Sequence, residues 1–177
     1  ACDVDERTPV HLAFRGDNVD AISMLASKGA KVNGRELSCS RYFCGATVDS
    51  SVLLYAAKSG HAGAIKALAQ LGADVSNTRS VITPADSPVH IAAQYGHAEV
   101  IEALVALGAH VNFPLGKCCT SSSPLHLAAM NGHATAITAL LRLGADTNVR
   151  DASRLTPLDK AVESGCLEAI KALLAFG

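Results

Sequence analysis

The apolar residues of this chain recur in one register along five segments that align without gaps. The segments span residues 8–29, 51–72, 87–108, 123–144 and 156–177. Each one begins with Thr or Ser, carries an Ile at one shared position and a Leu three residues later, and ends on Gly. Self-similarity at a constant register is the sequence signature of a repeat architecture. The pattern therefore predicts a chain built from about five copies of one structural unit.

Residues 123–144 indicate the secondary structure of each unit. Ser123 is a favourable helix N-cap, and Pro124 suits the first helical position, where its missing N–H costs nothing. We expect Gly132 to end this first helix, because Gly accepts the left-handed conformation of the turn. A second helix is expected over about 134–143. Each helix has one apolar face, and such a short pair buries both faces only by stacking on its neighbours. The face residues are Leu125, Ala128 and Ala129 in the first helix and Ile137, Leu140 and Leu141 in the second.

Two segments carry the pattern of a known repeat. Residues 123–133 read Ser-Pro-Leu-His-Leu-Ala-Ala-Met-Asn-Gly-His, and residues 143–148 read Leu-Gly-Ala-Asp-Thr-Asn. Residues 87–97 read Ser-Pro-Val-His-Ile-Ala-Ala-Gln-Tyr-Gly-His. These stretches closely resemble the ankyrin repeat. The resemblance implies an all-α ankyrin-repeat solenoid of about five stacked helix–turn–helix repeats with β-hairpin-like linkers.

The whole chain, 1–177, is expected to form a single ankyrin repeat domain. Its repeats are predicted near residues 8–32, 51–75, 87–112, 123–148 and 156–177. The last helix lacks the polar outer face that terminal repeats need for solubility. We therefore expect either that the chain is a fragment of a longer protein or that this end docks on another surface. The apolar residues of the last helix are Ala169, Ile170, Leu173 and Leu174.

The linker between the first two repeats is much longer than the others and contains an insertion over residues 33–49. Insertions in repeat arrays form loops, often on the binding face. This one carries Arg41, Tyr42 and Phe43 in succession. Because Tyr and Arg are enriched among binding hot spots, these residues are candidates for partner contact. The alternative is that Tyr42 or Phe43 folds back onto the helices as a small local core.

Composition excludes several kinds of function. The net charge is −1, with 15 basic and 16 acidic residues mixed along the chain, so no basic patch for nucleic acid is expected. No apolar run approaches the roughly 20 residues that a membrane-spanning helix needs. Aromatic residues make up 4% and Trp is absent, which offers little for a cofactor pocket. We expect neither nucleic acid, nor membrane insertion, nor a cofactor.

Histidines and cysteines do not form a recognisable metal or catalytic site. Six of the seven histidines occupy two repeat positions: His11, His90 and His126 in one, and His61, His97 and His133 in the other. The resemblance implies that these side chains hydrogen-bond neighbouring backbone, and we expect irregular His110 to lie on the surface. In the last repeat, Asp159 and Cys166 occupy the two positions instead. No CxxC pair is present, so no zinc site is expected.

The cysteines are predicted to be free thiols in a reducing compartment, that is, the cytoplasm or nucleus, or a host cytosol if the protein is a secreted effector. A Cys39–Cys44 disulfide is the alternative. Ser123 and His126 superficially resemble a nucleophile and its base. Both, however, have structural roles in the repeat, and no acidic partner is recognisable. The chain is therefore not expected to be an enzyme.

The family resemblance implies a module that binds another protein in a concave groove and through its inter-repeat loops. In ankyrin arrays the two residues before the inter-helix Gly point into that groove. Along the chain the groove is then expected to run from basic to acidic, with Tyr95 and Met130 side by side at its centre. The candidate binding residues are Arg15, Lys58, Gln94, Tyr95, Met130, Asn131 and Glu163.

Asn148 is a candidate modification site. It resembles the ankyrin asparagines that an iron- and 2-oxoglutarate-dependent hydroxylase modifies, whereas the simpler interpretation is an Asn that bonds across the linker turn. Two other functions stay open beside a scaffold, adaptor, regulator or effector targeting module. One is a substrate-recruiting domain of a larger enzyme, and the other is a structural array that associates with itself.

Overall fold

The computed structural model describes residues 13, 18–28, 49–70, 87–112 and 122–176. Within these ranges the chain forms helices and no β-strand, which confirms the predicted all-α class. The first repeat contributes α2 (Val19–Ser27) to this part. The later repeats contribute the pairs α3 (Asp49–Ser59) and α4 (Ala62–Gln70), α5 (Pro88–Gln94) and α6 (Ala98–Ala106), α7 (Pro124–Met130) and α8 (Ala134–Arg142), and α9 (Pro157–Glu163) and α10 (Leu167–Leu174).

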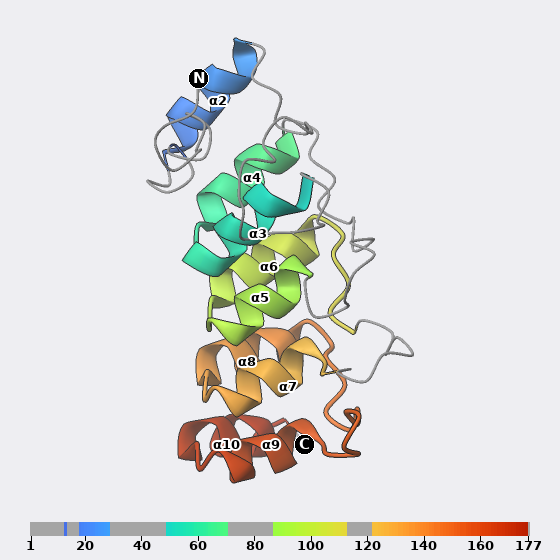
Figure 1. The fold of residues 1–177 in the computed structure, drawn as a ribbon. Helices are drawn as coiled ribbons and strands as arrows, with labels where there is room; N and C mark the ends of the chain where they lie inside the picture. The colour runs from blue at the N-terminus through green and yellow to red at the C-terminus, as the bar shows by residue number, and fades with distance from the viewer. Residues whose placement is uncertain (1–12, 14–17, 29–48, 71–86, 113–121, 177) are drawn as a thin grey trace, which may run out of the picture.

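The helix pairs stack in chain order along one axis (Figure 1). The first helices α3, α5, α7 and α9 pack side by side, and the second helices α2, α4, α6, α8 and α10 form a parallel layer behind them. Each helix pair also packs internally. This arrangement gives the stack one face made of first helices and an opposite face made of second helices.

The helix termini follow the capping chemistry of the sequence. The Ser123 hydroxyl accepts a hydrogen bond from the His126 N–H, and Pro124 takes the first helical position of α7. Gly132 has φ of 75°, the left-handed conformation expected after a first helix. Thr156 and Asp159 form a capping box at α9, so the Asp that replaces His in the last repeat also supports the helix start.

The core consists of small and branched aliphatic residues contributed by every repeat. The shared Ile position is almost fully buried in four repeats, at Ile22, Ile65, Ile101 and Ile137. Adjacent alanines of the first helices, such as Ala92 and Ala93, have no exposed surface. Their small side chains let the helices of successive repeats approach closely, which explains why the array is rich in Ala.

The start of α3 and the form of one linker differ from the sequence prediction. Helix α3 begins at Asp49, so the last residue of the predicted insertion belongs to a helix. The rest of that insertion lies outside the described residues. The linker between α8 and α9 is described completely and contains turns, one of which is closed by a hydrogen bond from the Asp151 N–H to the Leu155 carbonyl at 3.0 Å. This linker reverses direction tightly, as the tip of a hairpin does, but it forms no strand ladder.

Candidate protein-interaction face

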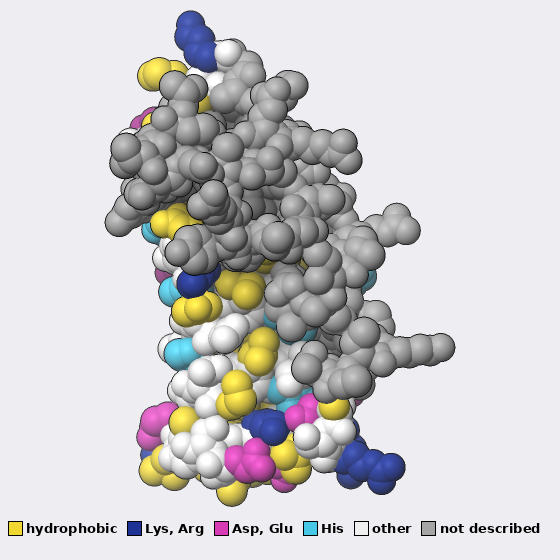
Figure 2. All heavy atoms as spheres, viewed as in Figure 1, with side chains coloured by type: hydrophobic (Ala, Val, Ile, Leu, Met, Phe, Trp, Pro, Cys, Tyr) yellow, Lys and Arg dark blue, Asp and Glu magenta, His cyan; other side chains and the backbone are white. Residues whose placement is uncertain are grey.

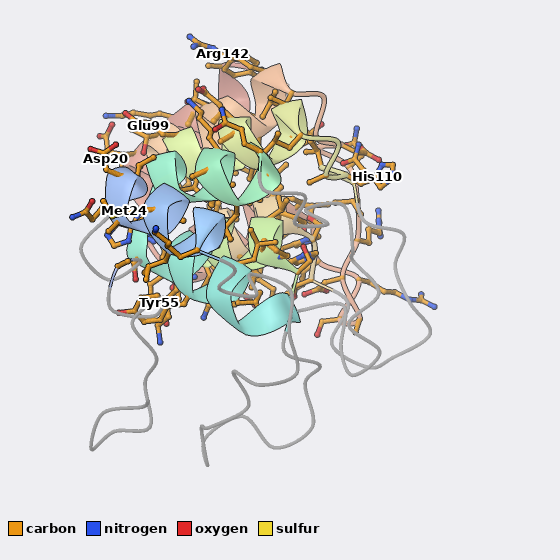
Figure 3. All side chains as sticks on the ribbon, turned by 90° about the horizontal axis from the view of Figure 1, so that it is seen from above. Asp20, Met24, Tyr55, Glu99, His110 and Arg142 are labelled. Carbon is orange, nitrogen blue, oxygen red and sulfur yellow. The ribbon has the colours of Figure 1, made fainter. Side chains whose placement is uncertain are left out.

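We define the first-helix face as the exposed side chains of α3, α5, α7 and α9 and of the residue that follows each helix. The sequence-predicted candidates that the structure describes are all exposed on these elements. Tyr55 of α3 projects from the side of the stack opposite Arg142 of α8 (Figure 3). Figure 2 looks onto the first-helix face and shows apolar side chains at intervals down its middle. The face includes Tyr55, Lys58, Gln94, Tyr95, Met130, Asn131 and Glu163.

Lys58 and Tyr95 come together across a repeat boundary. The Lys58 Nζ lies 5.4 Å from the centre of the Tyr95 ring, within the range of a cation–π contact. The Tyr95 ring also stacks on His97, with 6.5 Å between ring centres and 10° between planes. His97 Nε2 lies 2.9 Å from the Lys58 main-chain oxygen, and since a carbonyl only accepts, Nε2 carries the proton. The three residues therefore fix one another.

Tyr95 and Met130 are the two large apolar groups at the centre of the face. Their exposed fractions are 42% and 44%. They occupy neighbouring first-helix units, since α5 packs directly on α7. The Tyr95 ring, however, contacts Lys58 of the preceding repeat and His97 of its own repeat. Direct contact between Tyr95 and Met130 stays a prediction.

Tyr55 was missed by the sequence reasoning, although it is 39% exposed on α3. It lies three residues before Lys58, so the two side chains share one side of the helix. The corresponding positions in the next two repeats hold Ile91 and Leu127, which are only partly exposed. The missed signal was an aromatic residue at a repeat position that carries an aliphatic residue in the next two repeats.

The two amide residues of the face, Gln94 and Asn131, differ in their hydrogen bonding. Asn131 Nδ2 donates to the Leu127 carbonyl oxygen at 2.8 Å, which leaves its side-chain oxygen toward solvent. Gln94 is exposed, and its main-chain oxygen accepts a hydrogen bond from His133 Nε2 at 3.0 Å. The histidine thus holds the backbone of a face residue from the following repeat.

The acidic end of the face is partly neutralised. Lys160 Nζ lies 3.2 Å from Glu163 Oε2 and 3.4 Å from Asp151 Oδ2. The hydrogen bond to Glu163 raises the pKa of Lys160 above its ordinary value. Burial raises the pKa of Asp151, but hydrogen bonds from the Leu155 and Ser153 N–H groups and from Lys160 outweigh burial and lower it. Lys160 was not among the candidates predicted from the sequence, and its ion pair with Glu163 offsets part of the negative charge at this end of the face.

Three repeat histidines, His97, His126 and His133, hydrogen-bond neighbouring backbone as the resemblance implied. His61 Nδ1, in contrast, is buried without a hydrogen-bond partner in the described ranges, and His11 lies outside them. His126 Nε2 donates to the Leu155 carbonyl at 2.9 Å, while its Nδ1 accepts from the Ser123 N–H at 3.2 Å. Burial lowers the pKa of His126 despite the hydrogen bond to Leu155. His90 Nδ1 lies 3.0 Å from the Ser87 hydroxyl. His110 is exposed, as predicted, at the edge of the stack (Figure 3).

Several predicted residues are not tested by this geometry. Arg15, Arg41, Tyr42 and Phe43 lie outside the described residues. Asn148 is exposed, and its N–H donates to Asp146 Oδ1 at 2.8 Å; no described residue hydrogen-bonds its side chain. Its hydroxylation stays a prediction.

Metal and membrane chemistry find no support in the described ranges. No group of three or more His, Cys, Asp or Glu side chains there is placed to hold a metal ion. None of the described helices has the length and hydropathy needed to cross a bilayer.

The geometry defines the class as a stacked helical-repeat protein in which histidines join successive units at the Lys58 and Gln94 backbone. A family model described as ankyrin repeats in three copies matches residues 35–114 and 89–177, and the chain belongs to the ankyrin repeat family. No curated protein matches the chain significantly in sequence. Ankyrin repeats generally serve as non-catalytic modules of protein–protein interaction and typically bind other proteins.

Proposed function

We propose that this chain is a non-catalytic module that binds a partner protein on its first-helix face, aided by the inter-repeat loops. It would act as a scaffold, adaptor, regulator or effector targeting domain. The observation that carries the proposal is the unequal distribution, over the central repeats α3 to α8, of exposed apolar side chains between the two faces. The free thiol of Cys166 fits a reducing compartment, the cytoplasm or the nucleus, as the place of this function.

The inequality holds over α3 to α8 and the turns that close each pair, whereas in the terminal repeats the second helices α2 and α10 also expose apolar side chains, namely Val19, Met24, Leu167 and Leu174. Four large apolar side chains are exposed over α3 to α8, and three of them, Tyr55, Tyr95 and Met130, belong to the first-helix face. The fourth, Leu107, follows α6. The second helices α4, α6 and α8 instead expose mainly polar side chains: Lys66, Gln70, Glu99, Glu102, Thr135 and Arg142. Because exposed aromatic and Met side chains on one face commonly mark contact sites, the first-helix face is the better binding surface.

The proposal is tested by quantitative capture of partners from cell lysate. The native chain is compared with Tyr95→Ala plus Met130→Ala on the first-helix face, and with Glu102→Ala plus Arg142→Ala on the second-helix face. A third variant, Tyr42→Ala plus Phe43→Ala, tests the insertion. Circular dichroism first shows that each variant stays helical.

We expect a specific partner of the native chain to be lost with the first-helix variant and kept with the second-helix variant. Loss only with the insertion variant would move recognition to residues 33–49. Retention of every native partner by the first-helix variant would refute binding on this face.

A second candidate function, self-association, is favoured by the exposed side of the last repeat. Val162 is 59% exposed, whereas Ala57, Ala93 and Ala129 at the same repeat position are fully buried by the repeat that follows each. Leu174 of α10 is also largely exposed. A second copy packing on this side would bury the same positions that the internal repeat interfaces bury. Light scattering should then show a mass that rises with concentration and falls in Val162→Lys; a strict monomer at high concentration rejects this candidate.

A further inference from the structure

Lys58 is a cation of the first-helix face that has no carboxylate counterpart among the described residues. The other lysine on α3, α5, α7 or α9 is Lys160, and it is paired with Asp151 and Glu163. No ion pair joins Lys58 to another residue of the described ranges, and its side chain is exposed. An ammonium group in this situation is available to an incoming anion.

The position of this ammonium group is fixed by its surroundings. Its main chain is held by the hydrogen bond from His97 Nε2, and its Nζ lies over the Tyr95 ring. That ring is in turn held parallel to the His97 ring. A charged group that is already ordered costs less conformational entropy when it binds than a freely rotating lysine does. The cluster therefore combines a fixed positive charge with a half-exposed aromatic surface.

Apolar surface flanks this charge along the stack. Tyr55 precedes Lys58 by one helical turn on α3, and Met130 lies on α7, beyond the Tyr95 ring. Met fills irregular contacts because its side chain is unbranched and adaptable. Neighbouring helices pack about 8–10 Å apart, and an extended chain rises about 3.3 Å per residue. An extended segment crossing from the cluster to Met130 would cover that distance in about two to four residues.

We propose that Lys58 and Tyr95 receive the carboxylate of an Asp or Glu in an extended partner segment, and that Met130 receives an apolar side chain about two to four residues away in the same segment. This inference rests on the proposed binding at the first-helix face and specifies the chemistry of the partner. The carboxylate forms an ion pair with the Lys58 ammonium. The stem of the acidic residue lies against the edge of the Tyr95 ring.

The test is a selection from a displayed library of random twelve-residue peptides. The native chain is compared with Lys58→Glu and with Lys66→Glu, an equal charge reversal at an exposed site on α4 of the same repeat. Native chain and Lys66→Glu should both enrich peptides with an acidic residue two to four positions from Leu, Met, Phe or Tyr. Lys58→Glu should instead enrich Lys or Arg at the acidic position. A selected peptide should bind Lys58→Glu at least tenfold more weakly than Lys66→Glu, and more weakly as salt is raised, because an exposed ion pair is screened.

Unchanged acidic enrichment by Lys58→Glu, or no acidic enrichment by the native chain, overturns the inference. The proposed function is judged separately with Tyr95→Ala plus Met130→Ala. If peptides selected by the native chain lose affinity for that double variant but show no acidic preference, the face binds partners and only the carboxylate site is wrong. If they bind the double variant as well as the native chain, both proposals fail.

Discussion

His133 Nε2 donates a hydrogen bond to the main-chain oxygen of Gln94, 3.0 Å away in the preceding repeat. His97 makes the same bond to Lys58 one repeat earlier. The repeat histidine thus joins consecutive units at the residue that also contributes to the first-helix face. Stacking and the shape of the interaction face therefore depend on the same contact.

Replacement of His133 should measure this contact. His133→Ala removes one hydrogen bond, which typically contributes about 1 kcal/mol to the free energy of unfolding. Urea unfolding should show a loss of about this size. His110→Ala, at an exposed residue outside the repeat positions, should change stability by less than about 0.5 kcal/mol. Equal losses of stability in the two variants would show that the hydrogen bond of His133 does not stabilise the stack.

The last repeat lacks this bridge and offers the reverse experiment. Cys166 occupies the histidine position, and among the described residues its thiol hydrogen-bonds the Ser164 carbonyl of its own repeat, 3.6 Å away. In Cys166→His, Nε2 would reach the Met130 main-chain oxygen, the counterpart of the oxygens of Lys58 and Gln94. We expect a gain of about 1 kcal/mol in unfolding free energy. A loss of stability would show that the space beside Gly132 cannot accept the ring.

Gly96 is required because of its positive φ and because His133 lies close to it. A matched variant at Gly144 separates the two effects. Its φ is 79°, and a Cβ built there would lie 2.6 Å from His133 Nδ1. Gly144 has a similar φ of 87° but open space around it. Gly144→Ala should therefore cost about 1–2 kcal/mol from backbone strain alone. Gly96→Ala should cost about 1 kcal/mol more, because it also displaces the bridging histidine, and equal costs measured in urea would contradict this.

Stability should fall in mild acid because of His126. Burial lowers the pKa of His126 in the folded state, so the unfolded chain takes up the proton more readily. This contribution is fully present above the ordinary histidine pKa of about 6.5 and is lost as the pH falls through and below that value. Protonation would also remove the Nδ1 acceptor for the Ser123 N–H.

The measurement is the urea midpoint at pH 7.5 and pH 5.5. The native chain should lose more stability between these values than His126→Asn, which cannot titrate there. An equal loss in both proteins would assign the pH dependence to other groups.

The elements that the sequence predicted well are those determined by local chemistry. Ser123 and Pro124 begin a helix because of their own hydrogen-bonding and dihedral preferences, and Gly132 ends it by adopting a positive φ. The shared Ile position is buried in almost every repeat because a stacked array offers one core. Such features depend on few residues and recur in most copies.

The chemistry of the face was predicted only in part, because its contacts cross repeat boundaries. The Lys58–Tyr95 contact depends on how α3 and α5 stack. The Lys160–Asp151 ion pair depends on the linker turn that brings Asp151 to α9, a turn in which Arg154 has φ of 63°. A non-Gly residue in that conformation is uncommon and has no clear sequence signal. Distances of this kind follow from tertiary packing and not from spacing along the chain.

Site-specific photo-cross-linking tests the central claim most directly. A benzophenone amino acid is placed at Tyr95 on the first-helix face or at Glu99, an exposed residue of α6 in the same repeat. In lysate, the Tyr95 position should yield a covalent adduct with one partner protein, and the Glu99 position should not. An adduct formed only from Glu99, or equally from both positions, would contradict binding on the first-helix face.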